Sequence, residues 1–185
     1  MTINTERLIL QHFSGTDTEA EQMMKNWISD PLIQKEYGEP VYTTKEELGP
    51  LLKRYREDPY RWAVYEKQSG ECIGQIAFCK IWNHVKTAEI EYCIGAGYQG
   101  HGYAGEALSA VIAYGLTRAG FSKLEAYHRM ENTRSGKVLL KSSMHTTDTI
   151  ERFIQEGKKP ANEICYCITA DEWRLRNTDR FEPAP

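Results

Sequence analysis

The stretch Gln99-Gly100-His101-Gly102-Tyr103-Ala104 lies between a segment with strand periodicity and a segment with helix periodicity. Before it, residues 88–94 alternate apolar and polar side chains, and after it apolar residues at helical spacing predict a helix over Gly102 to Ala119. Glycines let a backbone approach a ligand closely, and a helix N-terminus offers unpaired N–H groups and the positive end of its dipole. The sequence therefore predicts a phosphate-binding loop, with an ordinary glycine-rich connection as the alternative.

The same letters satisfy a second pattern, because residues 100–105 read G-x-G-x-x-G, the dinucleotide fingerprint. In that fingerprint the glycines follow the strand directly, whereas residues 95–99 intervene here. The acidic residue expected at the end of the next strand is missing, since the only carboxylate of residues 123–129, Glu125, is in mid-segment. Several predicted strands also precede the loop. These observations disfavour a nicotinamide or flavin enzyme.

Composition indicates one ordinary folded domain, with 185 residues of which 41% are hydrophobic and 26% charged. We expect the domain to span residues 1–174 and a loose tail to span 175–185. A net charge of −3 argues against a nucleic-acid surface and is compatible with a cationic amine as substrate. No apolar run approaches the ~20 residues of a membrane span, and the N-terminus does not read as a signal peptide. A cytoplasmic protein without a membrane partner is expected.

The cysteines and histidines give little support for a metal site. The five cysteines have no Cys-x-x-Cys spacing and mostly fall in predicted strands, so they are interpreted as small buried hydrophobes. The five histidines are scattered, without a pair at helical or zinc-finger spacing. His101, within the loop, is either a solvated side chain or a phosphate contact.

Periodicity and breakers predict an alternation of strands and helices. Asp30-Pro31 and Gly38-Glu39-Pro40 are interpreted as breakers, which leaves a flexible stretch from Asp30 to Thr44. The helix over 102–119 returns the chain to a strand at 123–128, which predicts a right-handed parallel crossover from the strand over 86–94. The other expected strands are 5–10, 62–66, 72–81, 146–155 and 163–170, and the other expected helices are 20–28, 48–55 and Asn132 to about Ser143.

Taken as Gln/Arg-x-x-Gly-x-Gly/Ala, the loop resembles the acetyl-coenzyme A pyrophosphate loop of the GNAT (GCN5-related) N-acetyltransferases. Four segments are similar to the ribosomal-protein N-acetyltransferase branch (the Rim J and L type): Thr5–Leu10, Ala88–Leu108, Glu131–Ser135 and Asp171–Trp173. The resemblance covers most of the chain. It implies an α/β (α+β) fold, with a mixed, mostly antiparallel sheet of about seven strands, a parallel pair at its centre and about four flanking helices. It also implies acetyl-coenzyme A as cosubstrate, no metal, an amine acceptor, and a monomer or homodimer.

Two carboxylates are candidates for the base that amine acetylation requires, because a protonated amine cannot attack a thioester. In a strand Glu89 and Glu91 point to the same face, together with Cys93. Glu89 matches the position where several GNAT enzymes hold a catalytic glutamate, whereas Glu91 stands where the Rim-type branch commonly has glycine. We favour Glu89. The alternative is that one or both glutamates solvate a strand face or pair with Lys86 or an arginine.

The resemblance also assigns the remaining site residues. The fourth-helix tyrosine of many GNAT enzymes corresponds to Leu139, so Ser135 is the candidate donor to the departing thiolate; a hydroxyl bonding backbone is the alternative. Asn132 is expected to cap its helix and contact the pantetheine arm, and backbone N–H groups near Cys93 and Ile94 to meet the oxyanion. Residues 141–145 depart from the branch, which usually has Gly-Phe there. The expected cofactor-binding residues are Cys93, Ile94, Gln99, Gly100, His101, Gly102, Tyr103, Ala104 and Asn132.

The sequence therefore predicts an acetyltransferase that moves an acetyl group from acetyl-coenzyme A to a primary amine, either a protein N-terminus or a small molecule. A catalytically silent module that binds or senses acyl-coenzyme A is the alternative.

Overall fold

The computed structural model describes residues 1–153 and 160–177 of the chain. It divides into two compact units, which we call the first unit (Met1–Cys79 and Glu91–Val111) and the second unit (Lys80–Ile90 and the chain from Ile112 onward). The described residues form eight strands, hydrogen bonded in the order β1-β2-β3-β4-β5-β6-β8-β7, and six α-helices. The predicted mixed α/β fold, mostly antiparallel with one parallel pair, is confirmed. Among these residues, no helix combines the length and apolar character needed to cross a bilayer.

The first unit begins with a hairpin and a layer of helices. Its elements are β1 (Thr2–Asn4), β2 (Leu8–Gln11), α1 (Asp17–Met23), a π-helical turn (Met24–Ile28), α2 (Pro31–Tyr37), α3 (Lys45–Glu57) and β3 (Arg61–Glu66). Three elements run from one unit into the other: β4 (Cys72–Trp82), β5 (Thr87–Ile94) and α4 (Tyr103–Thr117). The predicted helix over 20–28 is therefore found as α1 followed by the π-helical turn.

Two predictions at the start of the chain are wrong. The expected strand Thr5–Leu10 begins only at Leu8, because Thr5 to Arg7 form the turn between β1 and β2. The expected flexible stretch from Asp30 to Thr44 contains α2. Asp30 caps this helix by accepting hydrogen bonds from the N–H groups of Leu32 and Ile33, and Gly38 ends it in the left-handed conformation.

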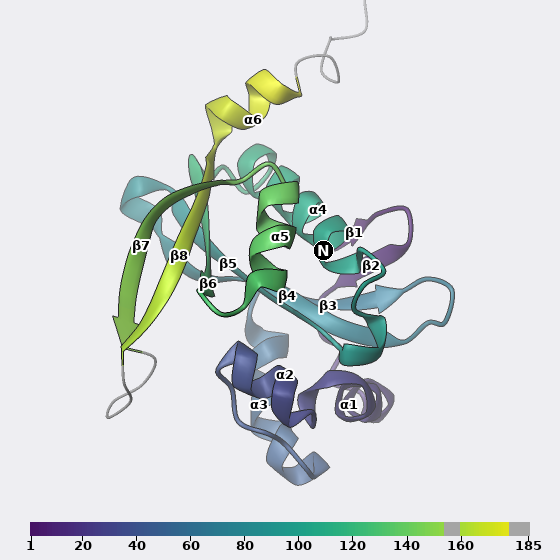
Figure 1. Cartoon of the computed structure of the whole chain (residues 1–185). Coiled ribbons are helices and arrows are strands. Elements are labelled where there is room, and N and C mark those ends of the chain that lie inside the picture. The colour runs from purple at the N-terminus through teal and green to yellow at the C-terminus, as the bar shows by residue number, and fades with distance from the viewer. Residues whose placement is uncertain (154–159, 178–185) are drawn as a thin grey trace, which may run out of the picture. The chain divides into compact units, whose positions relative to one another are not determined.

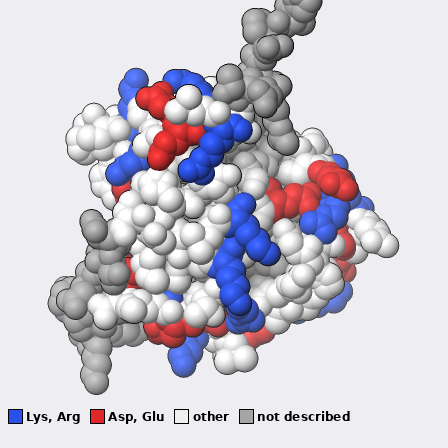
Figure 2. Space-filling model, turned by 45° about the horizontal axis from the view of Figure 1, so that its top comes forward, with Lys and Arg blue, Asp and Glu red and all other residues white. Residues whose placement is uncertain are grey.

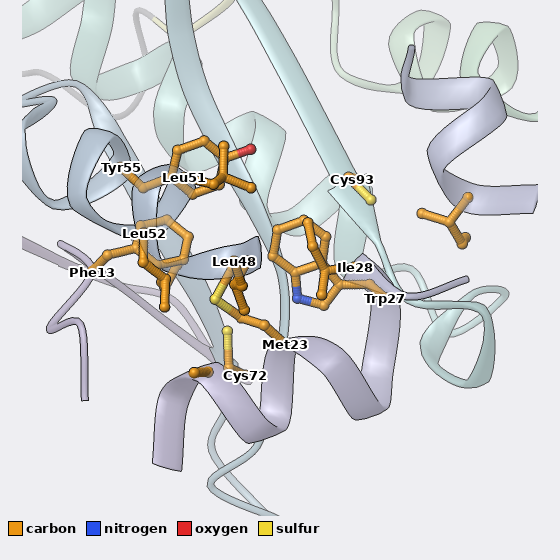
Figure 3. Packing of buried hydrophobic residues seen from close by; sticks show 13 residues of the cluster. Phe13, Met23, Trp27, Ile28, Leu48, Leu51, Leu52, Tyr55, Cys72 and Cys93 are labelled. Atoms are coloured by element: carbon orange, nitrogen blue, oxygen red, sulfur yellow. The ribbon is translucent and has the colours of Figure 1, made fainter. Parts of the chain in front are cut away.

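Helices α1, α2 and α3 lie together on one side of β3 and β4 (Figure 1). Their apolar faces form a core cluster that also includes Ala63, Cys72 and Cys93 from the strands. Figure 3 shows the side chains of Met23 and Trp27 between those of α3 and the strand carrying Cys93. Burial raises the pKa of Cys72 to about 12, so this thiol behaves as the small buried hydrophobe that the sequence predicted.

The second unit contains the parallel pair. Its further elements are β6 (Lys123–Arg129), α5 (Thr133–Lys141), β7 (His145–Phe153), β8 (Pro160–Thr169) and α6 (Ala170–Arg176). Strands β5 and β6 pair in parallel, with Glu89 opposite Glu125, which confirms the predicted parallel pair. β7 and β8 form a long antiparallel ribbon that leads into α6 (Figure 1). Helix α6 continues past Trp173 to Arg176, so the predicted tail is helical at its start; residues 178–185 lie outside the described residues.

On the face shown in Figure 2, some groups of charged side chains combine acidic and basic residues, and one elongated group near the centre is basic. Several of the ion pairs link neighbouring elements, such as Lys25 of the π-helical turn with Glu71 before β4, at 2.8 Å.

Candidate active site

The predicted phosphate loop lies between the end of β5 and the start of α4, in the first unit. After a 3₁₀ turn (Ala96–Tyr98), Gly100 and Gly102 both adopt φ = +84°, a left-handed backbone that favours glycine. A Cβ built on Gly100 would have no atom within 4 Å, so the backbone there faces open space. Gln99 donates from its side chain to the carbonyl of Ile94 (3.0 Å) and so ties the loop back to the strand end.

The first turn of α4 is held by a clamp from the turn between β1 and β2. The carboxylate of Glu106 accepts hydrogen bonds from the hydroxyl of Thr5, from the backbone N–H of Arg7 (2.7 Å) and from Nε of Arg7 (2.7 Å). Burial alone would raise the pKa of Glu106, but the hydrogen bonds from Thr5 and Arg7 outweigh it and hold that pKa below its usual value. This clamp was not predicted, because Thr5 to Arg7 were expected to lie in a strand.

Arg7 also reaches the loop itself. Its guanidinium donates to the carbonyl of His101 (2.8 Å) and lies 4.8 Å from the centre of the Tyr103 ring. The hydroxyl of Tyr103 donates to Glu66, and the His101 ring stacks beside Tyr103 while its side chain remains exposed. These contacts hold the outer side of the loop against the turn between β1 and β2 and against Glu66.

Glu91, the second candidate base, is part of a partly buried polar network in the first unit. Its Oε1 lies 2.7 Å from a guanidinium nitrogen of Arg61 and accepts a hydrogen bond from the hydroxyl of Tyr37 (2.6 Å). Gln75 joins both partners, since its amide donates to the Tyr37 hydroxyl and its carbonyl accepts from Arg61. The Arg61 side chain is only 10% exposed, so it needs a counter-ion. Glu91 therefore balances a buried cation.

An aromatic ring and a second carboxylate also contact the Arg61 guanidinium. The guanidinium of Arg61 stacks on the ring of Tyr55, with 4.4 Å from its central carbon to the ring centre, and its Nε lies 3.3 Å from Asp58. Burial and then the Glu91 carboxylate raise the pKa of Tyr37 well above its usual value, so the phenol stays protonated and donates.

The end of β5, where the oxyanion contact was predicted, approaches β4 closely. A Cβ on Gly74 would lie 2.1 Å from the carbonyl oxygen of Cys93, so only glycine fits at that position. The N–H of Gly95 donates to the carbonyl of Ile73 (2.8 Å). Cys93 is 6% exposed, and burial followed by the charge of Glu91 raises the pKa of its thiol above the usual value.

Glu89, the favoured base, belongs to the second unit. It is 8% exposed, and its Oε2 lies 3.2 Å from the ammonium of Lys80, whose own side chain is 55% exposed. The alternative to a catalytic role was a pair with Lys86 or an arginine; Lys86 is in a left-handed turn just before β5, and Lys80 is the lysine at ion-pair distance. Because Lys80 is largely in water, its attraction for Glu89 is screened.

Asn132 and Ser135 are brought together at the start of α5, also in the second unit. Asn132 caps the helix as predicted, by accepting a hydrogen bond from the N–H of Ser135 (3.1 Å). The Ser135 side chain is half-buried. Leu139, at the position where many GNAT enzymes have tyrosine, is fully buried and belongs to the core.

The family description "Acetyltransferase (GNAT) domain" matches residues 7–145. The chain belongs to the GNAT acetyltransferase family. A similar curated relative is the uncharacterized N-acetyltransferase YnaD of Bacillus subtilis, 28% identical over 173 residues that cover 94% of this chain and 99% of that protein. The ribosomal-protein-serine acetyltransferase of Escherichia coli is 25% identical over 119 residues, which cover 64% of this chain and 65% of that protein.

Solved structures give the same family. A GNAT-family acetyltransferase from Bacillus anthracis superposes with a TM-score of 0.80 at 27% identity, covering 93% of this chain and all of that one. The spermidine N-acetyltransferase of Vibrio cholerae, solved in complex with CoA and spermine, superposes with a TM-score of 0.75 at 16% identity, covering 91% of this chain and 99% of that one, and so shares the fold. N-acetyltransferase activity is thus supported at the level of the family.

Proposed function

We propose that this protein transfers the acetyl group of acetyl-coenzyme A to a primary amine, and that it belongs to the ribosomal-protein N-acetyltransferase branch of the family. The observation that carries the proposal is the loop, in which two glycines with φ = +84° precede the N-terminus of a fifteen-residue helix. Such a terminus presents backbone N–H groups and a positive partial charge to an anion. The E. coli relative supports the choice of branch.

The loop residues fit a pyrophosphate by their backbone. Left-handed glycines turn successive N–H groups toward one side, and the open space above Gly100 leaves room for a charged group. We assign residues Gln99 to Ala104 to the pyrophosphate and Asn132 to the pantetheine arm. Acetyl-coenzyme A supplies a thioester, whose carbonyl carbon the amine attacks; the N–H groups near Cys93 and Ile94 are assigned to the oxyanion.

We assign the base to Glu89. Alkyl ammonium groups have pKa values near 10 and α-ammonium groups near 8, so at neutral pH the acceptor must lose a proton before it attacks. Glu91 is the poorer candidate, because the guanidinium of Arg61 and the hydroxyl of Tyr37 already occupy its Oε1. Glu89 faces the exposed cation Lys80, and water can compete for that contact. Ser135 is assigned as hydrogen-bond donor to the thiolate that departs.

The acceptor class is proposed as a protein N-terminus. The support is that the E. coli relative is named as a ribosomal-protein-serine acetyltransferase. A small polyamine is the second possibility, for which the spermidine enzyme of V. cholerae gives support at the level of the fold.

A silent acyl-coenzyme A binding module remains the second candidate function, and one observation favours it. Both candidate bases make ion pairs, Glu89 with Lys80 and Glu91 with Arg61. In such a module the loop would hold the ligand while the carboxylates served only the fold.

The two functions are separated by mass spectrometry after incubation with acetyl-coenzyme A and a panel of N-terminal peptides and small amines. We expect an N-acetylated peptide together with free coenzyme A. The Gly102→Asp variant, incubated in parallel, controls for chemical acetylation. Calorimetric binding of acetyl-coenzyme A without any acetylated product across both classes of amine would favour the silent module.

A further inference from the structure

A cysteine, a histidine and a glutamate meet at one edge of the second unit, in a cluster that the acetyl-transfer proposal does not use. Nε2 of His145, at the start of β7, lies 3.5 Å from Sγ of Cys167 on β8, a hydrogen-bond distance for sulfur. Nδ1 of the same ring lies 3.6 Å from Oε1 of Glu172 on α6, an ion-pair distance. His145 and Cys167 are direct partners in the antiparallel register, so the sheet itself sets their separation.

The two contacts are on opposite nitrogens of one imidazole. The Glu172 contact is at ion-pair distance and is longer than a hydrogen bond; its negative charge beside Nδ1 favours the tautomer with the proton on Nδ1, which leaves Nε2 as the acceptor facing the thiol. This is the arrangement of nucleophile, base and orienting carboxylate that activates cysteine in unrelated folds. Because the sulfur and the carboxylate lie on different sides of the ring, they do not converge on a common metal position.

The groups around Glu172 and Cys167 determine the protonation states of this carboxylate and this thiol. Hydrogen bonds from the backbone and the hydroxyl of Thr169 hold the pKa of Glu172 below its usual value, so it stays a carboxylate. Burial raises the pKa of the Cys167 thiol; Lys123 of β6 opposes this, while Cys165, Glu172 and Glu125 add to it. The thiol is therefore protonated at neutral pH and requires a base to react.

Access to this thiol is restricted by size. Cys167 is 7% exposed, whereas the His145 and Glu172 side chains are 44% and 36% exposed. A small uncharged reagent can approach the edge of the ring where a bulky one would not. Among the cysteines, all of which lie in the described residues, Cys79 is more exposed than Cys167, which is buried like the other three.

We propose that Cys167, with His145 as its base and Glu172 orienting the ring, is a modification site for small hydroperoxides. The thiol proton passes to Nε2 as Sγ attacks one peroxide oxygen and the O–O bond breaks. The departing hydroxide or alkoxide takes the proton from the imidazolium and leaves as water or an alcohol. The sulfur loses two electrons and becomes a sulfenic acid, and the peroxide is reduced by the same two.

The test exposes the folded protein to hydrogen peroxide, traps sulfenic acid with dimedone and measures each cysteine by peptide mass spectrometry. We expect Cys167 to be labelled faster than Cys79, although Cys79 is more exposed. His145→Gln is expected to lower the Cys167 rate at least tenfold and to leave the Cys79 rate unchanged. In the variant the Cys167 rate should rise only at the higher pH where the thiol itself ionises, because burial raises the pKa of that thiol.

Glu172→Gln gives a sharper test of the orienting role. The amide oxygen can still cap α6 through Thr169, but its NH₂ would face Nδ1 and favour the tautomer whose Nε2 carries the proton. That tautomer cannot accept the thiol proton, so the Cys167 rate should fall as in His145→Gln. Asp171→Asn is the matched control, because the same charge is removed from a neighbouring residue that faces Arg174 instead.

Two results would overturn the proposal. One is a Cys167 rate that His145→Gln leaves unchanged in protein whose circular dichroism and melting temperature match the wild type. The other is labelling that follows exposure, with Cys79 modified first and Cys167 modified only after unfolding.

Discussion

Replacing Glu91 by glutamine should cost stability, because it removes the counter-ion of a buried guanidinium. Breaking a fully buried ion pair costs about 3–5 kcal/mol. The cost here should be lower, since the Glu91 side chain is 30% exposed, Asp58 remains 3.3 Å from Nε of Arg61, and glutamine keeps an acceptor oxygen for Tyr37. We therefore expect a loss of about 2 kcal/mol in the free energy of unfolding.

Urea unfolding followed by tryptophan fluorescence measures this loss, because Trp27 and Trp62 are fully buried. Glu21→Gln is the matched control: it removes the same charge from an exposed pair with Lys45 in the same unit and should cause no measurable change. A double-mutant cycle with Arg61→Met should return a coupling of about 1–3 kcal/mol. A Glu91→Gln variant as stable as the wild type, or a coupling near zero, would refute the structural role of this carboxylate.

Three further results are expected. Gly102→Asp places a side chain at φ = +84° beside the Arg7 guanidinium. Calorimetry should show acetyl-coenzyme A binding weakened at least tenfold, or about 1.4 kcal/mol. Gly70→Asp, at φ = +70° in open space, is the control that should share the backbone strain but keep the affinity. Ser135→Ala should lower kcat with little change in melting temperature. Ser142→Ala, which loses a hydroxyl bonded to the Leu139 carbonyl at 2.6 Å, should lower the melting temperature with little change in kcat. Equal kcat for Ser135→Ala and wild type would contradict the donor assignment. The folded pKa of Glu106 lies below its unfolded value of about 4.5, so its contribution to stability is complete above that pH and is lost as the pH falls through the folded pKa. The stability difference between wild type and Glu106→Gln should therefore shrink on acidification below pH 4.5, and a difference that grows would show that the sign is wrong.

Local patterns in the sequence were sufficient for the centre of the fold. The strand over 86–94, the loop and the following helix were predicted from periodicity, and the crossover rule then required the parallel pair with the strand at 123–128. Asn132 could be identified as a helix cap because capping is decided within three residues of chain.

Helix α2 was missed because its boundary signals were interpreted as breakers. Asp30 followed by Pro31 is an N-cap and first helical residue, and Gly38 is a C-terminal stop, so the same letters mark the two ends of a seven-residue helix. The apolar pair between these signals, Leu32 and Ile33, gives little helix periodicity, and only Ile33 is buried.

The partners of the charged residues were harder to predict, because they depend on pairing between distant segments. Glu91 and Arg61 are thirty positions apart and lie on β5 and β3, the two strands that flank β4 in the sheet. The clamp joins Arg7 to Glu106 across ninety-nine positions. An arginine partner was among the expectations for the glutamates, but nothing local indicated which one. For Glu89 the alternatives considered were Lys86 and an arginine, whereas the lysine found at ion-pair distance is Lys80.

A kinetic measurement decides whether Glu89 acts as the base. The turnover of acetyl transfer by Glu89→Gln is measured across pH with an amine identified by mass spectrometry, beside acetyl-coenzyme A affinity by calorimetry. We predict nearly intact affinity and a kcat lower by roughly 10²-fold or more at neutral pH, with the loss shrinking as the amine loses its proton unaided at high pH. A kcat equal to that of the wild type across this pH range would show that Glu89 is not the base.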